Sequence, residues 1–206
     1  MVAVWPTIHA ERQALLADLE QLSDEQWRTR SLCSQWTVTQ VFGHVIATAQ
    51  MTPPRFLLGM IGSGFNFTSF IQKNADRFST GTPGELLATF RGLQHRTNHP
   101  PGPNDTWLGE AIVHAEDIRR PLGLHRDYPV EAVTQVADSY KGSNLVIGAK
   151  NRIAGVTLRA TDTDWSHGSG PEASGHAIDL LLAMTGRTAG LDRLNGDGVE
   201  VLRSRM

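Results

Sequence analysis

The segment Thr37-Val-Thr-Gln-Val-Phe-Gly-His-Val-Ile46 has the start signal and the apolar stripe of an amphipathic helix. Thr37 and Gln40 are three residues apart, which is the spacing of a capping box at a helix N-terminus. The apolar residues then recur at helical spacing: Val38, Val41, Phe42, Val45 and Ile46. We therefore predict a helix over about residues 38–51, which Pro53 and Pro54 end or kink.

Three more long helices are predicted around this one. The first covers about residues 5–22, where Ile8, Leu15 and Leu19 share one face. Another begins at Pro83, because Thr82 and Glu85 form a further capping box. Ser23 and Gln26 have the same spacing and predict a short turn around Trp27. The last covers about residues 105–120 and is closed by Pro121 and Gly123. Four such helices predict an up-down four-helix bundle.

A shorter helix is predicted over about residues 129–141, and the sequence pattern changes after about residue 142. There, Val156–Ala160 alternates apolar and polar residues, as a half-buried strand does. Residues 177–184 form an apolar helix, and Val199–Leu202 is predicted to add a short strand. The predicted fold is therefore mainly α, with a helical domain over 1–142 and a small α+β domain over 143–206.

Composition narrows the classes of function. The chain has 206 residues, with 19 Lys and Arg against 21 Asp and Glu, a formal net charge of −2, which argues against nucleic acid as a partner. Cys33 is the only cysteine, so neither an internal disulfide nor a thiolate zinc cluster is expected. With no signal peptide or membrane span in the pattern, we expect a cytoplasmic protein, monomeric or homodimeric, with no membrane partner.

Two imidazoles and a carboxylate are candidates for a metal site. Glu110 and His114 are four residues apart, so their side chains lie on the same inward face of the helix over 105–120. His44 lies on the inward side of the helix over 38–51. Three such ligands with one open position are typical of catalytic zinc, and nickel, iron or manganese suit them as well. The alternative is that these residues only form hydrogen bonds within the core.

Other polar residues carry weaker signals. Asp117 follows His114 by three residues, so it could orient that ligand or pair with an arginine. His95 and His99 are expected at a solvated helix terminus, because Pro100 and Pro101 follow them at once. The chain has neither the H-E-x-x-H helix of metalloproteases nor a G-x-S-x-G elbow after a strand, so these hydrolase classes are not indicated.

Several segments resemble one family. Trp36–His44 is similar to the entry of the second helix in the DinB-like superfamily, and Gly109–Gly123 looks like the fourth-helix motif of its mycothiol-dependent maleylpyruvate isomerase family. The C-terminal segments Thr161–Gly168, Thr185–Arg187 and Leu194–Val199 also resemble that family, in the same order.

The resemblance implies a DinB-like bundle whose metal is held by His44, Glu110 and His114, followed by a small C-terminal α+β domain. It implies mycothiol as a cosubstrate whose thiolate attacks a small electrophile, in transfer of sulfur or in thiol-assisted isomerisation. The family also uses an arginine of the C-terminal domain for its acidic substrate, and Arg187 is the candidate here. Two alternatives remain: a non-catalytic module that binds a small molecule, and a partner-binding protein whose metal only stabilises the bundle.

Overall fold

Three helices begin at the capping boxes that the sequence predicts: α2 (Asp24–Trp27), α3 (Val38–Gln50) and α6 (Pro83–Arg91). The N-cap residues are Ser23, Thr37 and Thr82, and each hydroxyl accepts a hydrogen bond from the third helical backbone N–H. The side chain of that third residue in turn accepts from the N-cap N–H, so two otherwise unpaired donors are satisfied at each start.

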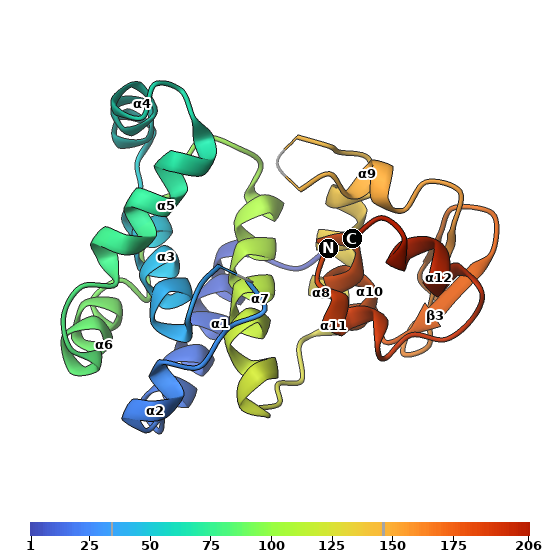
Figure 1. The fold of residues 1–206 in the computed structure, drawn as a ribbon, viewed down its shortest axis with the longest axis horizontal. Helices are drawn as coiled ribbons and strands as arrows, with labels where there is room; N and C mark the ends of the chain where they lie inside the picture. Colours follow the sequence, from blue (N-terminus) through green and yellow to red (C-terminus); the bar gives the residue numbers. More distant parts are fainter. Residues whose placement is uncertain (34, 146) are drawn as a thin grey trace. The chain divides into compact units, whose positions relative to one another are not determined.

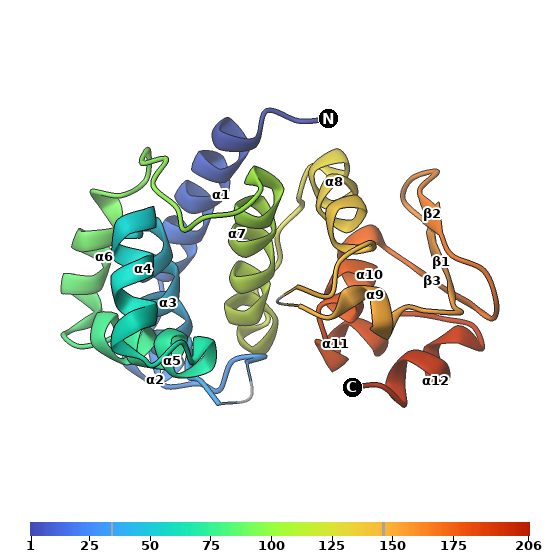
Figure 2. The same cartoon turned by 90° about the horizontal axis from the view of Figure 1, so that it is seen from above.

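The computed structural model describes residues 1–33, 35–145 and 147–206, and divides into two units. The helical unit, Trp5–His125, contains the four predicted long helices, which are α1 (Val4–Leu19), α3, α6 and α7 (Asn104–Arg119) (Figure 1). Their apolar faces enclose one core, in which Phe42 lies 5.6 Å from Trp27 and 5.0 Å from Phe90 between ring centroids. The four predicted helices are confirmed, and Figure 2 shows α7 beside α1 from above.

Two short helices, α4 (Pro53–Gly62) and α5 (Phe67–Phe78), connect α3 to α6. The turn between them contains Gly64 and Phe65, both at positive φ. The backbone of α5 and the residue after it come very close to α3 at Gly43, where an added Cβ would lie 2.7 Å from the backbone nitrogen of Ser79. Gly43 therefore allows α3 and α5 to approach at the turn that carries His44.

The second unit consists of Met1–Val4 and Arg126–Met206. Its sheet has the order β2-β1-β3, with β1 (Thr157–Ala160) antiparallel to β2 (Ser166–His167) and parallel to β3 (Glu172–Gly175). The helices of the unit are α8 (Val130–Tyr140), α9 (Ala149–Arg152), α10 (Ala177–Met184), α11 (Thr188–Leu191) and α12 (Gly198–Arg203). Strand β1 confirms the predicted one, and β3 was not predicted.

Two expectations for the C-terminal part need correction. Residues 199–202 belong to helix α12 and not to a strand, because Val199 and Leu202, three residues apart, are both buried on one helical face. The predicted domain boundary near residue 142 also differs from the division of the structure, which falls between His125 and Arg126. The reason is that α8 packs against α10 of the second unit.

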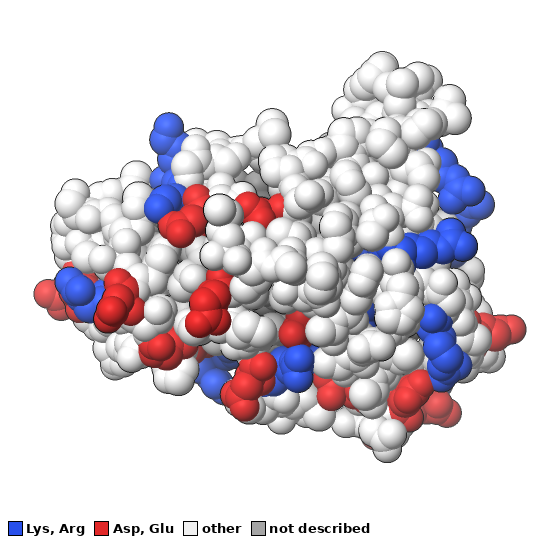
Figure 3. All heavy atoms as spheres, turned by 180° about the vertical axis from the view of Figure 1, so that it is seen from behind, with Lys and Arg blue, Asp and Glu red and all other residues white. Residues whose placement is uncertain are grey.

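The predicted fold class, mainly α with a small α+β part, is confirmed. Among the residues that the structure describes, no helix combines the length and the apolar character needed to cross a bilayer. Acidic and basic side chains both occur on the face shown in Figure 3, several of them next to one another, and broad areas of this face are uncharged.

Candidate metal centre

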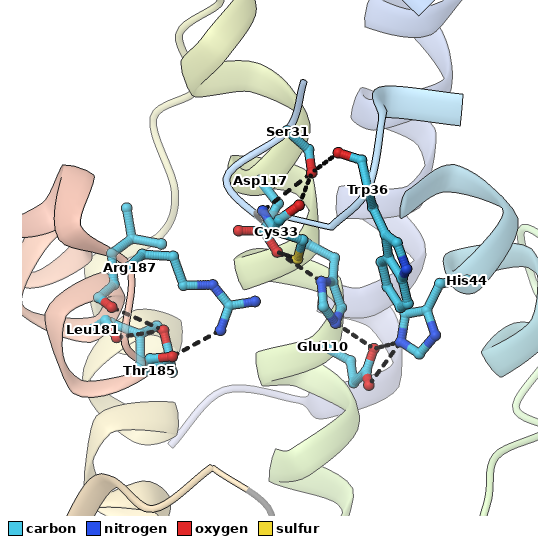
Figure 4. A network of polar contacts seen from close by, with 11 residues as sticks. Ser31, Cys33, Trp36, His44, Glu110, Asp117, Leu181, Thr185 and Arg187 are labelled. Atoms are coloured by element: carbon cyan, nitrogen blue, oxygen red, sulfur yellow. Dashed lines mark hydrogen bonds and ion pairs between the residues drawn. The ribbon is translucent and has the colours of Figure 1, made fainter. Parts of the chain in front are cut away.

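His44 of α3 meets Glu110 and His114 of α7. Figure 4 shows His44 and Glu110 pointing toward each other. The Nε2 atom of His44 lies 3.3 Å from Oε2 of Glu110, and Nε2 of His114 lies 3.3 Å from the same oxygen. One ligand atom from each of the three residues lies within 4.8 Å of the others. The structure therefore brings together the three side chains that the sequence singled out.

The Oε2 atom of Glu110 is buried and forms no hydrogen bond of acceptable geometry, although both imidazole nitrogens are near it. A buried oxygen without a hydrogen-bond partner is costly unless another group, such as an ion, satisfies it. Donors arranged tetrahedrally about 2.1 Å from a zinc ion are about 3.4 Å apart, close to the separations seen here. The residues present thus fit a divalent ion in donor type and in spacing.

Electrostatic coupling ties the carboxylate to the imidazoles. Burial raises the pKa of Glu110, but the charges of His114 and His44 outweigh it and bring this pKa well below its usual range. Burial lowers the pKa of His114, yet Glu110, with hydrogen bonds from its surroundings, raises it well above the usual range. Without an ion, the pair therefore favours an ionised carboxylate beside a protonated imidazole.

The loop before α3 shields His44. This residue is buried, and its ring lies 5.3 Å from that of Trp36 and 4.8 Å from that of His114, between centroids. The indole N–H of Trp36 donates to Oε1 of Gln72 on α5 at 2.8 Å, which holds the ring in place. The apolar face of Trp36 thus limits access of water to one side of the site.

Asp117 supports His114 from behind. Its side chain is fully buried, and its Oδ2 lies 2.8 Å from Nδ1 of His114. Cys33 donates its thiol hydrogen to the same oxygen at 3.0 Å. A carboxylate on Nδ1 selects the tautomer whose Nε2 lone pair faces the ion position. Of the two roles considered for Asp117, the geometry therefore supports the orienting one.

The contact of Cys33 with this group had no signal in the sequence. Neither helical spacing nor a known motif connects Cys33 to α7. The structure ties its loop to α7 through the backbone, since the N–H of Leu32 donates to the carbonyl of Asp117 at 3.1 Å. Ser31 accepts from the N–H of Cys33 at 3.1 Å and donates to the carbonyl of Trp36 at 2.9 Å.

Arg187 lies in the C-terminal unit, whereas the metal-ligand candidates lie in the helical unit. It is the N-cap residue of α11, and its Nη1 donates to the carbonyl of Thr185 at 2.9 Å. The charge of Arg187, second to burial, lowers the pKa of the neighbouring Arg152. This part of the C-terminal unit therefore concentrates positive charge.

The histidines near the end of α6 are only partly as expected. Helix α6 ends at Arg91, so His95 and His99 do lie beyond it, and His95 is exposed. His99, however, is half-buried, with its ring centroid 5.6 Å from that of Trp5 and 5.5 Å from that of Trp107. His99 is half-buried because the proline-rich segment that contains it packs against both α1 and α7.

A family model matches the N-terminal part of the chain. Residues 8–55, which include His44, match the family model described as Mycothiol maleylpyruvate isomerase N-terminal domain. This match confirms the predicted resemblance for residues 8–55. The match ends before Glu110 and His114, so those two positions depend on the geometry above.

Solved structures support the fold of the whole chain. The crystal structure of a mycothiol-dependent maleylpyruvate isomerase is similar, with a TM-score of 0.65 at 14% identity, over 94% of this chain and 91% of that one. A histidine-to-alanine mutant of such an isomerase gives a TM-score of 0.67 at 13% identity, with the same coverage. These likenesses show the fold, a helical bundle with a small α+β part. A comparison with curated protein sequences gives no significant match.

Proposed function

We propose that this chain is a metal-dependent enzyme that uses a low-molecular-weight thiol as a nucleophile toward a small electrophile. The observation that carries the proposal is the buried, unpaired Oε2 of Glu110 between the Nε2 atoms of His44 and His114. The family match and the similar structures favour mycothiol as the thiol. A small-molecule electrophile and this thiol are thus the proposed partners.

His44, Glu110 and His114 would hold the ion, and zinc is the first choice for two nitrogens and one oxygen. A bound divalent ion with an open position lowers the pKa of a thiol, so that the thiolate is available at neutral pH. Asp117 would accept the Nδ1 hydrogen of His114, so that Nε2 is the nitrogen that gives up its proton when an ion binds. Trp36 excludes water beside His44. Arg187 is proposed to orient an anionic group of the substrate.

Two reactions are compatible with these groups. In thiol-assisted isomerisation, sulfur forms a bond to one carbon of a conjugated double bond, the resulting single bond rotates, and sulfur leaves with its electron pair. In sulfur transfer, the thiolate instead displaces a leaving group or remains bonded as a thioether. Both need a thiolate near neutral pH and a held electrophile, so they share the same site requirements.

The test compares the protein with His44→Ala. Elemental analysis is expected to find about one divalent ion per wild-type chain and none in the variant, with the circular dichroism spectrum unchanged. With mycothiol present, the metal-loaded wild type is expected to isomerise maleylpyruvate or to form a thioether with a generic electrophile. Metal binding without any thiol-dependent turnover would contradict the proposal of an enzyme and favour a module that only binds a small molecule. Loss of the fold in His44→Ala would favour a structural metal.

A further inference from the structure

A pocket lies beside the proposed metal ligands, within the helical unit. It is partly open and includes Glu110 in its wall. The other wall residues come from α1, α3, α7 and the segment before α7: Glu11, Arg12, Leu15, Val45, Thr48, Asn98, His99, Trp107 and Ala111.

Arg12 is the unusual residue of this wall. Only 8% of it is exposed, and its Nη1 donates to the carbonyls of Leu93 at 3.3 Å and Arg96 at 2.7 Å. Those carbonyls are neutral, and no carboxylate within the described part of the chain pairs with this guanidinium. Burial lowers the pKa of Arg12 to about 10, so the group still carries its charge at neutral pH.

A second donor on the wall is also unsatisfied. The indole Nε1 of Trp107 is buried and has no hydrogen-bond partner among the described residues. A buried cation without an acid and a buried N–H without an acceptor both favour a ligand that brings negative charge and oxygen atoms. The apolar side chains of Leu15, Val45 and Ala111 suit the carbon skeleton of such a ligand.

We infer that Arg12 binds the carboxylate of a small, singly charged substrate whose reactive carbons lie toward Glu110. The inference deepens the proposed function and rests on it for the reaction, but not for the binding. A dianionic phosphate is disfavoured, because Arg12 is the one lysine or arginine among the described wall residues, while Glu11 and Glu110 are acids. Arg12 would thus determine specificity from within the helical unit, separately from Arg187.

Binding of crotonate, a conjugated monocarboxylate, tests the inference against its neutral isostere crotonamide. On the full chain loaded with zinc, ligand-observed NMR is expected to show crotonate binding at least about tenfold tighter than crotonamide. Inorganic phosphate is expected not to compete. Equal binding of crotonate and crotonamide to the wild type would overturn the inference, and this comparison needs no variant.

Variants test whether Arg12 provides the positive charge that binds the carboxylate of crotonate. Arg12→Gln is expected to reduce crotonate affinity about tenfold or more and to leave crotonamide unchanged, whereas Arg12→Lys retains most of the affinity. Arg91→Gln, an exposed arginine paired with Glu20, is the control and should have no effect. Crotonate affinity that survives Arg12→Gln but falls with Arg187→Gln would overturn the inference. Zinc content, measured on the same samples, tests the proposed metal-dependent function separately. Failure to bind zinc would contradict that function, whereas crotonate binding alone decides the inference about Arg12.

Discussion

Replacing Asp117 by asparagine tests whether this buried carboxylate prepares His114 to bind a metal. The change keeps the size of the side chain but removes its charge, in a position that is fully buried. Its Oδ2 now contacts both Nδ1 of His114, at 2.8 Å, and the thiol of Cys33, at 3.0 Å. An amide can place its NH₂ group toward Nδ1, which would move the ring proton to Nε2 and block the ligand atom.

The expected loss is about 10–100-fold in zinc affinity, the usual effect of removing a group that orients a ligand. That range equals about 1.4–2.7 kcal/mol of binding free energy. A competition titration with a chromophoric chelator at pH 7.5 measures it. Asp18→Asn is the matched control, because Asp18 accepts from the buried Arg119 at 2.7 Å in the same unit and should affect stability, not zinc. Zinc affinity of Asp117→Asn within twofold of the wild type, with the fold intact, would refute the argument.

Three more outcomes follow from the structure. Thr37→Ala removes the hydroxyl that caps α3 and is expected to lower the free energy of unfolding by about 1 kcal/mol in a urea titration; no change would mean that solvent replaces the cap. Phe42→Ala empties the centre of the core, where Phe42 is 0% exposed, and should cost about 3–5 kcal/mol by the same measurement, so a cost below 1 kcal/mol would contradict the packing described. In the metal-free protein, the stability that His114 contributes is fully present below its ordinary pKa of 6.5 and is lost as the pH rises through its raised pKa in the folded state. The stability that Glu110 contributes is fully present above its ordinary pKa of 4.5 and is lost as the pH falls through its lowered pKa in the folded state. The melting temperature should therefore pass through a maximum between these limits in the wild type and flatten in Glu110→Gln; equal profiles would exclude the coupling.

The bundle could be predicted because its signals are local. Capping boxes at Ser23, Thr37 and Thr82 and apolar stripes of period 3.6 depend only on neighbouring residues, and all three boxes form. Strand β3 (Glu172–Gly175) depends instead on a distant partner, since it pairs with β1 in parallel. Its Glu-Ala-Ser-Gly sequence has little intrinsic preference for a strand. For that reason no local pattern revealed it.

The same distinction applies to the candidate metal centre. Glu110 and His114 were recognisable because four residues along a helix bring side chains together, and His44 because it lies on the inward face of its own helix. Cys33 reaches Asp117 across 84 positions of the chain. Arg12 was not singled out, because an arginine on a helix is ordinarily solvated. The carbonyls of Leu93 and Arg96, which accept hydrogen bonds from its guanidinium, are more than 80 positions away in the chain.

One stripe of α7 connects these observations. Trp107, Glu110, His114 and Asp117 follow one another at spacings of three, four and three, so they lie on the same face over about 15 Å of helix. Along that stripe, the pocket donor comes first, the two candidate metal ligands follow, and the carboxylate that orients the second ligand comes last. A rigid helix thus fixes the order of substrate pocket, ion and support. Because the spacing is set by the backbone, a one-residue insertion in α7 between positions 110 and 114 would rotate the two halves of the stripe by about 100° and turn His114 away from Glu110, whatever the chemistry of the individual side chains.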